Sequence, residues 1–183
     1  MERIAAGTIW WRIHRLEHRP LLFGPEAAGS PRHRFDAPGG EYRVVYAGAS
    51  REASFAEVFL REPDVEYVRV AEIQSRWVTR IRVCRPVALV VLHGPGLARA
   101  GVSATATTGD DYPRSCERAR GIWAMPERPD GVTYRARHDD GELSVALFDR
   151  ASDAIEVVGS APLDDDPRWL ASMALRYGFD FVP

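Results

Sequence analysis

The sequence predicts a single α+β domain spanning residues 1–183, with short strands in a mixed or antiparallel core and flanking helices. Three observations predict this class. Short β-rich segments recur along the chain, a few helical segments lie between them, and no internal repeat or linker divides the pattern. With 45% hydrophobic and 27% charged residues, the chain also has the composition of an ordinary globular protein with a sizeable core.

The first part of the chain predicts two strands, a long loop between them and a helix. Residues 8–14 are rich in β-branched and aromatic side chains, which is typical of a strand. Residues 15–40 contain four prolines and four glycines, so we expect a long loop, and such loops are often functional. Residues 43–48 predict a short strand. Ser50 is the expected N-cap of a helix that runs to about Arg61.

The middle of the chain predicts two strands and a polar connection. Residues 77–84 are β-rich, and residues 87–92 are apolar enough for a strand that is buried on both faces. A Gly-Pro-Gly turn at 94–96 precedes a short helix near Leu97. Residues 103–111 are rich in Ser and Thr and are expected to form a polar loop.

The last part of the chain predicts a hairpin between two helices. Residues 131–137 and 142–148 have the pattern of paired strands, with the turn expected at the Asp-Asp-Gly sequence of 139–141. Pro167 follows acidic residues, which predicts the first turn of a helix. The other expected elements are a helix at 113–124, a strand at 155–158, the end of the last helix near Tyr177 and an edge strand at 179–182.

The composition excludes several classes of protein. All 24 basic residues are arginines, and the chain contains neither lysine nor asparagine. P-loop, protein-kinase and Schiff-base chemistry all need a lysine and are therefore excluded. Arginine instead favours bidentate binding of phosphates and carboxylates. The net charge of −2 argues against direct binding of nucleic acid through arginine-rich loops.

The same features indicate a cytoplasmic protein. The two cysteines, Cys84 and Cys116, match no metal or redox motif in their spacing. No apolar run approaches the roughly 20 residues that cross a bilayer, and the N-terminus lacks the apolar segment of a signal peptide. We therefore expect no association with a membrane.

A strand, a tight turn and a capped helix follow one another between Tyr46 and Glu57. This arrangement puts a helix N-terminus beside a strand end, where anionic ligands bind. Glu57 has apolar neighbours, so a buried Glu57 needs a partner such as an arginine. Alternatively, Glu57 pairs with Arg61 four residues later on a solvated helix face.

Two arginines in the first part of the chain are candidate anion ligands. Arg12 lies in an apolar, aromatic strand and is either an edge residue facing solvent or an interior cation aimed at a phosphate or carboxylate. Arg34 lies in the Pro/Gly loop, where it either binds a diphosphate or is simply solvated.

The predicted hairpin carries a third group of candidates. Alternation along the strand puts Arg135 and Arg137 on one face and Tyr134 and Ala136 on the other. His138 is either a base or a turn residue. The histidines lack paired metal-ligand spacing, so we expect no metal site, and the absence of a Gly-x-Ser-x-Gly sequence argues against a serine hydrolase.

Taken in order along the chain, these residues resemble the RES domain, the family that supplies the toxins of bacterial RES–Xre toxin–antitoxin pairs. The resemblance rests on Arg12, on Arg34 followed by phenylalanine, on Tyr46 at a strand end and on Glu57 in the next helix. It continues through the Tyr-Arg-Ala-Arg sequence of 134–137.

The chain departs from the family pattern at two positions. Ala136 occupies the place of a serine that many relatives carry, and Asp36 occupies the place of an asparagine. Some family members also lack this serine, so its loss need not abolish activity.

The resemblance implies an ADP-ribosyltransferase-like fold and an enzyme that cleaves the nicotinamide–ribose bond of NAD. We expect phosphorolysis, which gives ADP-ribose-1″-phosphate and nicotinamide, or else hydrolysis of NAD to ADP-ribose and nicotinamide. The alternatives are ADP-ribosylation of a protein target and an inactive RES-like domain that binds nucleotides or partners; Ala136 and Asp36 keep the last one open.

The resemblance also implies roles and partners. Glu57 would stabilise the oxocarbenium ion, and Arg12 and Arg34 would bind the diphosphate or the incoming phosphate. Tyr46 would stack on nicotinamide or donate a hydrogen bond, and Arg137 and Ala136 would contact the substrate. NAD would be consumed as a substrate, with inorganic phosphate as co-substrate and no cofactor. The expected protein partner is a helix-turn-helix (Xre-type) antitoxin that covers the active site. The chain is expected to form either a homo-oligomer or a hetero-oligomer with this antitoxin.

Overall fold

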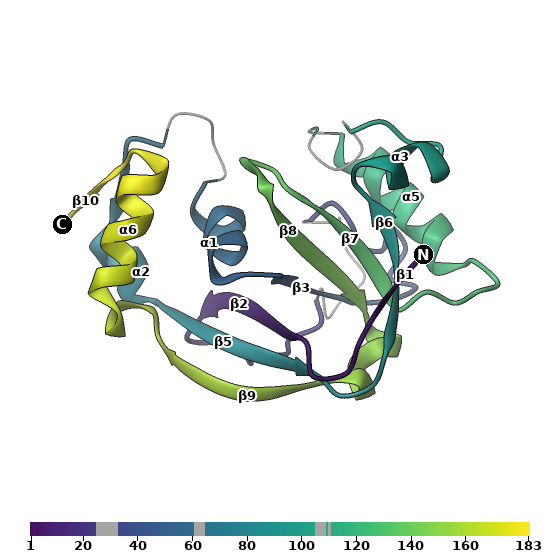
Figure 1. Cartoon of the computed structure of the whole chain (residues 1–183), viewed down its shortest axis with the longest axis horizontal. Helices are drawn as coiled ribbons and strands as arrows, with labels where there is room; N and C mark the ends of the chain where they lie inside the picture. The colour runs from purple at the N-terminus through teal and green to yellow at the C-terminus, as the bar shows by residue number, and fades with distance from the viewer. Residues whose placement is uncertain (25–32, 61–64, 105–108, 110) are drawn as a thin grey trace.

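A curved sheet with helices in its hollow and at both ends forms the architecture (Figure 1). The computed structural model describes residues 1–24, 33–60, 65–104, 109 and 111–183. The strands are β1 (Glu2–Ile4), β2 (Ile9–Arg15), β3 (Val44–Gly48), β4 (Tyr67–Arg69), β5 (Arg76–Val83), β6 (Val87–Leu92), β7 (Gly131–Ala136), β8 (Asp139–Phe148), β9 (Ile155–Pro162) and β10 (Asp180–Val182).

The helices are short and lie at three places around the sheet. Figure 1 shows α1 in the hollow, α2 and α6 at one end, and α3 and α5 at the other. Their bounds are α1 (Arg51–Phe59), α2 (Val70–Gln74), α3 (Pro95–Arg99), α5 (Tyr112–Trp123) and α6 (Pro167–Tyr177), with 3₁₀ turns η1 (Asp149–Ala154) and η2 (Leu163–Asp165). The predicted α+β class with flanking helices is confirmed.

The main sheet is mixed and has the strand order β1-β6-β7-β8-β3-β2-β5-β9. Strands β6 and β7 pair in parallel through a crossover that contains α3 and α5, and the other neighbours pair antiparallel. Strand β6 is largely buried, as its apolar sequence predicts. A separate parallel pair joins β10 to β4, so the chain's last residues form the expected edge strand.

The two halves of the sheet meet weakly between β2 and β3. In the part of the chain that the structure describes, one residue pair, Trp11 with Gly48, joins these strands. By contrast, β2 pairs with β5 along its full length, and β3 pairs with β8 along its own. The strands therefore diverge beyond this pair, and α1 fills part of the opening between them (Figure 1).

Helix α1 begins as the sequence predicts and is attached to both halves of the sheet. Ser50 is its N-cap, and the Ser50 hydroxyl accepts a hydrogen bond from Ala53 N at 2.8 Å. One turn later, the buried Ser54 hydroxyl donates to Trp11 O at 2.6 Å and accepts from Gly48 N at 3.2 Å. A single side chain therefore holds β2, β3 and α1 together.

The structure corrects several sequence-based expectations. The hairpin turn comprises Arg137 and His138, two residues earlier than predicted, and β8 already begins at Asp139. The Asp-Asp-Gly sequence is a local turn signal, whereas hydrogen bonds from α6 to Asp139 are tertiary and override it. Strand β1, strand β4 and helix α2 were not expected, because each has five residues or fewer and too little periodicity.

Two further predictions concern residues that lie outside the described ranges. Helix α1 ends at Phe59, so the predicted end near Arg61 and the alternative pairing of Glu57 with Arg61 lie outside the described residues. Parts of the predicted loops at 15–40 and 103–111 do so as well. Among the described helices, none is long and apolar enough to cross a membrane.

Replacement of Gly48 by alanine tests the contact between α1 and the sheet. A Cβ at position 48 would lie 2.6 Å from Ser54 N and 2.7 Å from Ser50 O, so backbone must move. We expect Gly48→Ala to lower the free energy of unfolding by about 1–3 kcal/mol, measured by urea denaturation. Gly121→Ala on α5, where a Cβ meets nothing within 4 Å, is the control and is expected to be neutral or stabilising. Equal midpoints for the two variants would show that α1 does not need a glycine at position 48.

Candidate active site

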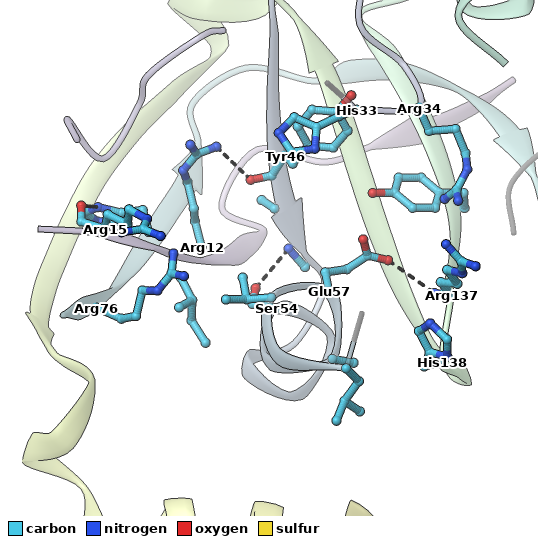
Figure 2. A pocket seen from close by; sticks show the side chains of 18 of the residues that line it. Arg12, Arg15, His33, Arg34, Tyr46, Ser54, Glu57, Arg76, Arg137 and His138 are labelled. Carbon is cyan, nitrogen blue, oxygen red and sulfur yellow. Dashed lines mark hydrogen bonds between the residues drawn. The ribbon is translucent and has the colours of Figure 1, made fainter. Parts of the chain in front are cut away.

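A cavity of about 730 Å³ lies where β2 and β3 diverge, with α1 as one wall (Figure 2). Among the described residues that line it, five are arginines and one is acidic, in a chain whose net charge is −2. The lining therefore carries five guanidinium groups against one carboxylate, a formal excess of four positive charges. These residues are Arg12, Arg15, Arg34, Arg76, Arg137 and Glu57.

Arg12 points from β2 into this cavity, which favours the interior-cation interpretation over an edge residue facing solvent. Its Nη1 donates to Tyr46 O at 3.0 Å, so a side chain bonds β3 where the diverging β2 backbone no longer does. Arg12 Nε has no hydrogen-bond partner among the described residues. Burial lowers the pKa of Arg12 to about 10, which marks a desolvated cation without a nearby carboxylate.

Glu57 lies one turn after Ser54 on α1, and Figure 2 shows its carboxylate directed into the cavity. Its Oε1 accepts a hydrogen bond from the backbone N–H of Arg137 at 3.3 Å. Glu57 is half-buried, with the buried residues Ala56 and Phe55 beside it in the helix. The carboxylate is therefore placed by its helix and by the hairpin turn that faces it.

Tyr46 organises the loop that closes one end of the cavity. Its hydroxyl donates to Asp36 Oδ1 at 3.0 Å and accepts from Phe35 N at 3.1 Å, and Asp36 Oδ2 accepts from His33 N at 2.9 Å. Burial and the Asp36 carboxylate raise the pKa of Tyr46 well above its usual value, so the hydroxyl keeps its proton. That proton is donated to Asp36, and the ring packs against His33 and Phe35, so both predicted roles of Tyr46 toward nicotinamide stay predictions.

Arg34 is buried on the wall opposite Arg12, not solvated. Its Nη2 donates to Gly109 O at 3.1 Å, and its guanidinium lies 5.4 Å from the centre of the Tyr112 ring. The buried Cys116 thiol, which contacts the backbone oxygens of His33 and Arg34, supports the same loop from behind. Loop 33–36 is thus a built part of the site.

The β7–β8 hairpin contributes residues that simple alternation misplaced. Tyr134 and Arg137 were expected on opposite faces, but both line the cavity. The register shifts between Arg135 and Ala136, and the strand ends there, so the alternation is interrupted. Ala136 is buried against Ala56 of α1 and does not line the cavity, and any contact of Ala136 with a substrate stays a prediction.

Sequence reasoning missed several residues that the fold brings to the cavity. Arg76 begins β5, is 9% exposed and has a 3.1 Å ion pair with Glu72. No sequence signal distinguishes it from Arg80 and Arg82 in the same strand. His14, buried beside Arg12 and Arg15, is held by Thr79 at 2.9 Å, and burial lowers its pKa, so it is neutral at pH 7.

The arrangement separates the guanidinium groups into two sets. Figure 2 shows Arg12, Arg15 and Arg76 on one side of Glu57 and Arg34 and Arg137 on the other. Such a cavity suits a ligand, or two ligands, with anionic groups on both sides of a reacting centre beside the carboxylate. Among the described residues, no group of three or more His, Cys, Asp or Glu side chains is arranged to hold a metal ion.

The chain is similar to known proteins in sequence and in fold. A family model described as RES domain matches residues 9–170. "Probable toxin y4kH" of Sinorhizobium fredii (strain NBRC 101917 / NGR234) is 31% identical over 98 residues, which are 54% of this chain and 76% of that protein. A chain in the crystal structure of the M. tuberculosis MbcT–MbcA toxin–antitoxin complex has a TM-score of 0.64 at 19% identity, over 87% of this chain and 85% of that one. At this identity the structural likeness shows a shared fold.

The Tyr46 hydroxyl can be tested by two substitutions. Tyr46→Phe removes a donor to the buried Asp36 and an acceptor for Phe35 N, so we expect the free energy of unfolding to fall by about 1–3 kcal/mol. Asp36→Asn keeps an oxygen for Tyr46 but places its NH2 group against His33 N, which now donates to Asp36 Oδ2, so it is also expected to lower the free energy of unfolding. Urea denaturation measures both, and a Tyr46→Phe midpoint equal to that of the unsubstituted protein would contradict this role.

Arg12 provides a test of the cavity as an anion site. Inorganic pyrophosphate at about 100 times its dissociation constant is expected to raise the unfolding temperature by about 5–10 °C. Arg12→Met should lose this shift, while its ligand-free unfolding temperature changes little, because the loss of the hydrogen bond to Tyr46 O offsets the removal of a desolvated charge. Arg3→Met, an exposed arginine of β1, is the control. An equal pyrophosphate shift in Arg12→Met would reject Arg12 as an anion ligand.

Proposed function

The chain belongs to the RES domain family, as its motifs predicted, and we propose that it cleaves the nicotinamide–ribose bond of NAD and transfers ADP-ribose to inorganic phosphate. The observation that carries this proposal is the position of Glu57 between two sets of guanidinium groups in one cavity. A dinucleotide has the size and the diphosphate that such a cavity suits, and a second anion occupies the second set.

The two sets of arginines divide the binding between the two substrates. Arg12 and Arg76, supported by Arg15, hold the diphosphate on the β2–β5 side of the cavity. Arg34 and Arg137 lie across Glu57 from that set, on the side toward which the Glu57 carboxylate points, and hold the incoming phosphate. NAD and phosphate together match the excess of positive charge better than NAD alone, which favours phosphorolysis over hydrolysis.

The proposed chemistry centres on the Glu57 carboxylate. The bond between C1 of the nicotinamide ribose and the ring nitrogen breaks, and its electron pair neutralises the positively charged nicotinamide ring. Positive charge develops on the ribose, and the Glu57 carboxylate stabilises it. A phosphate oxygen then bonds to C1, which gives ADP-ribose-1″-phosphate. The Tyr46 ring stacks on nicotinamide, and its hydroxyl remains with Asp36.

We further propose that the protein is the toxin of a toxin–antitoxin pair. One relative is named as a toxin, and the similar solved fold comes from a toxin–antitoxin complex. An enzyme that consumes NAD is harmful unless it is restrained. A protein partner that closes the cationic cavity, expected to be a helix-turn-helix antitoxin, would supply that restraint.

Substitution of Glu57 tests the proposed reaction. The purified protein is incubated with NAD, with and without inorganic phosphate, and products are identified by mass. We expect ADP-ribose-1″-phosphate and nicotinamide only with phosphate, and a kcat lowered by about 10²- to 10³-fold in Glu57→Gln. Glu52→Gln is the matched control, because Glu52 lies on the same helix, bonds Trp169 Nε1 at 2.9 Å and does not line the cavity.

Each other outcome points to a different function. Free ADP-ribose in both conditions would make the protein an NAD hydrolase. Intact NAD in both conditions would reject phosphorolysis and hydrolysis and leave ADP-ribosylation of a protein or simple nucleotide binding. Equal turnover by the Glu57→Gln and Glu52→Gln variants would reject Glu57 as the catalytic carboxylate.

A further inference from the structure

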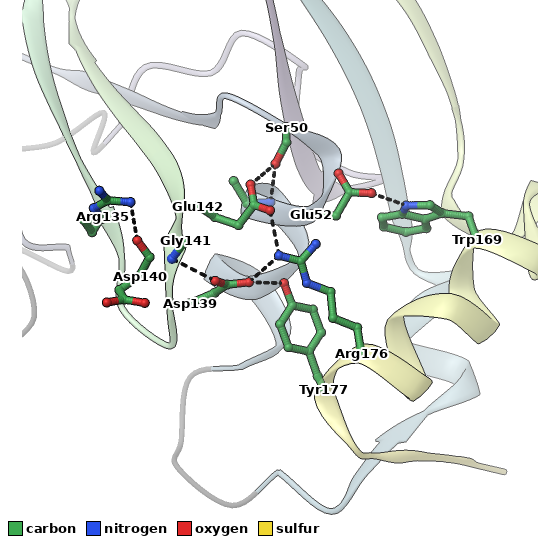
Figure 3. Close-up of polar contacts among 11 residues, drawn as sticks. Ser50, Glu52, Arg135, Asp139, Asp140, Gly141, Glu142, Trp169, Arg176 and Tyr177 are labelled. Carbon is green, nitrogen blue, oxygen red and sulfur yellow. Dashed lines mark hydrogen bonds and ion pairs between the residues drawn. The ribbon is translucent and has the colours of Figure 1, made fainter.

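Helix α6 bonds to the first residues of β8 in the β7–β8 hairpin (Figure 3). Arg176 Nη2 lies 2.8 Å from Asp139 Oδ2 and 2.8 Å from Glu142 Oε1. The neighbouring Tyr177 hydroxyl donates to Asp139 Oδ2 at 2.8 Å. The last turn of α6 therefore holds the first residues of β8 through three contacts.

The same helix is attached to α1, which carries Glu57. Trp169 Nε1 donates to Glu52 Oε1 at 2.9 Å, and Arg51 has a 2.8 Å ion pair with Asp166 at the start of α6. Glu142 completes the connection, because its Oε2 accepts from the Ser50 hydroxyl at 2.5 Å at the N-cap of α1. Helix α6 thus connects the hairpin to the start of α1.

The two-residue turn of the hairpin lies between this network and the cavity. Arg137 donates its backbone N–H to Glu57 Oε1 at 3.3 Å, and His138 lines the cavity. Immediately after them, Asp139 faces Arg176 and Tyr177. The position of the turn relative to Glu57 therefore depends on contacts at both of its ends.

Arg176 neutralises two carboxylates at the start of β8. The side chains of Asp139 and Glu142 are 15% and 17% exposed, and both contact one nitrogen of Arg176. Without the guanidinium, two poorly solvated carboxylates would remain close together and repel each other. Their separation moves the hairpin end, and with it the Arg137 N–H that bonds Glu57.

We propose that Arg176 is a positioning residue that holds the hairpin turn against α1 and so keeps the Glu57 carboxylate aligned for the reaction. This inference rests on the proposed function for its kinetic consequence. Arg176 is not among the described residues that line the cavity, and it acts through Asp139 and Glu142.

The test compares Arg176→Met with Arg168→Met, an exposed arginine on the same helix. In Arg176→Met we expect kcat for NAD cleavage to fall by about 10- to 100-fold with little change in KM, since the anion-binding arginines stay in place. Hydrogen exchange at residues 136–142 is expected to accelerate. Arg168→Met should match the unsubstituted protein in both measurements.

A double variant separates positioning by charge from a simple loss of contacts. In Arg176→Met with Glu142→Gln the repulsion is removed, while the glutamine oxygen still accepts from Ser50. We expect kcat and slow exchange to recover partly relative to Arg176→Met alone. A double variant that is slower still than the single variant would overturn the proposal, as would an Arg176→Met protein that equals Arg168→Met.

The outcomes also distinguish this inference from the proposed function. If the unsubstituted protein leaves NAD intact, the proposed function fails, and hydrogen exchange at the turn alone decides whether Arg176 holds the hairpin. If Arg176→Met does not fold, Tyr177→Phe removes one bond to Asp139 and is expected to accelerate exchange by a smaller factor. Unchanged exchange in folded Tyr177→Phe would then reject the proposal.

Discussion

The Ser54 hydroxyl bridges the residue pair at which the two halves of the sheet meet, and the cavity depends on that bridge. Trp11 of β2 accepts its hydrogen and Gly48 of β3 donates to it, so three elements are fixed relative to one another at one point. Beyond this point the strands diverge, and Arg12 and Tyr46 border the opening. Glu57, one turn further along α1, is placed by the same contact.

Among the described residues, the buried guanidinium of Arg12 has no carboxylate partner, whereas Arg76 in the same cavity pairs with Glu72. Burial desolvates Arg12, and its lowered pKa reflects that cost. A structural ion-pair network would place carboxylates there, as the surface pair of Arg82 with Glu156 does. An anion in the cavity would supply the partner that Arg12 lacks, so the residue that binds the ligand costs stability while the cavity is empty.

Local sequence signals predicted the longer helices and strands and the residues that begin or end them. The Ser50 cap, the apolar run of β6 and the proline at the start of α6 all appear as expected. Arg12, Arg34, Tyr46, Glu57 and Arg137, which stand far apart in the sequence, do line one cavity. Arg76 was not predicted as a site residue, because nothing in the sequence of β5 distinguishes it from the other arginines of that strand. The hairpin turn was misplaced because Asp139 bonds to α6, which is distant in the sequence.

The sequence by itself determined the class of fold, the family and the chemical character of the site, because these follow from local periodicity and from residue types in a fixed order. The all-arginine set of cations and Glu57 in a capped helix already favoured an anionic ligand. Only the tertiary structure decided where β2 and β3 part, which arginines face each other and that Ala136 packs against α1. Those facts depend on contacts between residues distant in the chain, and no local pattern encodes them.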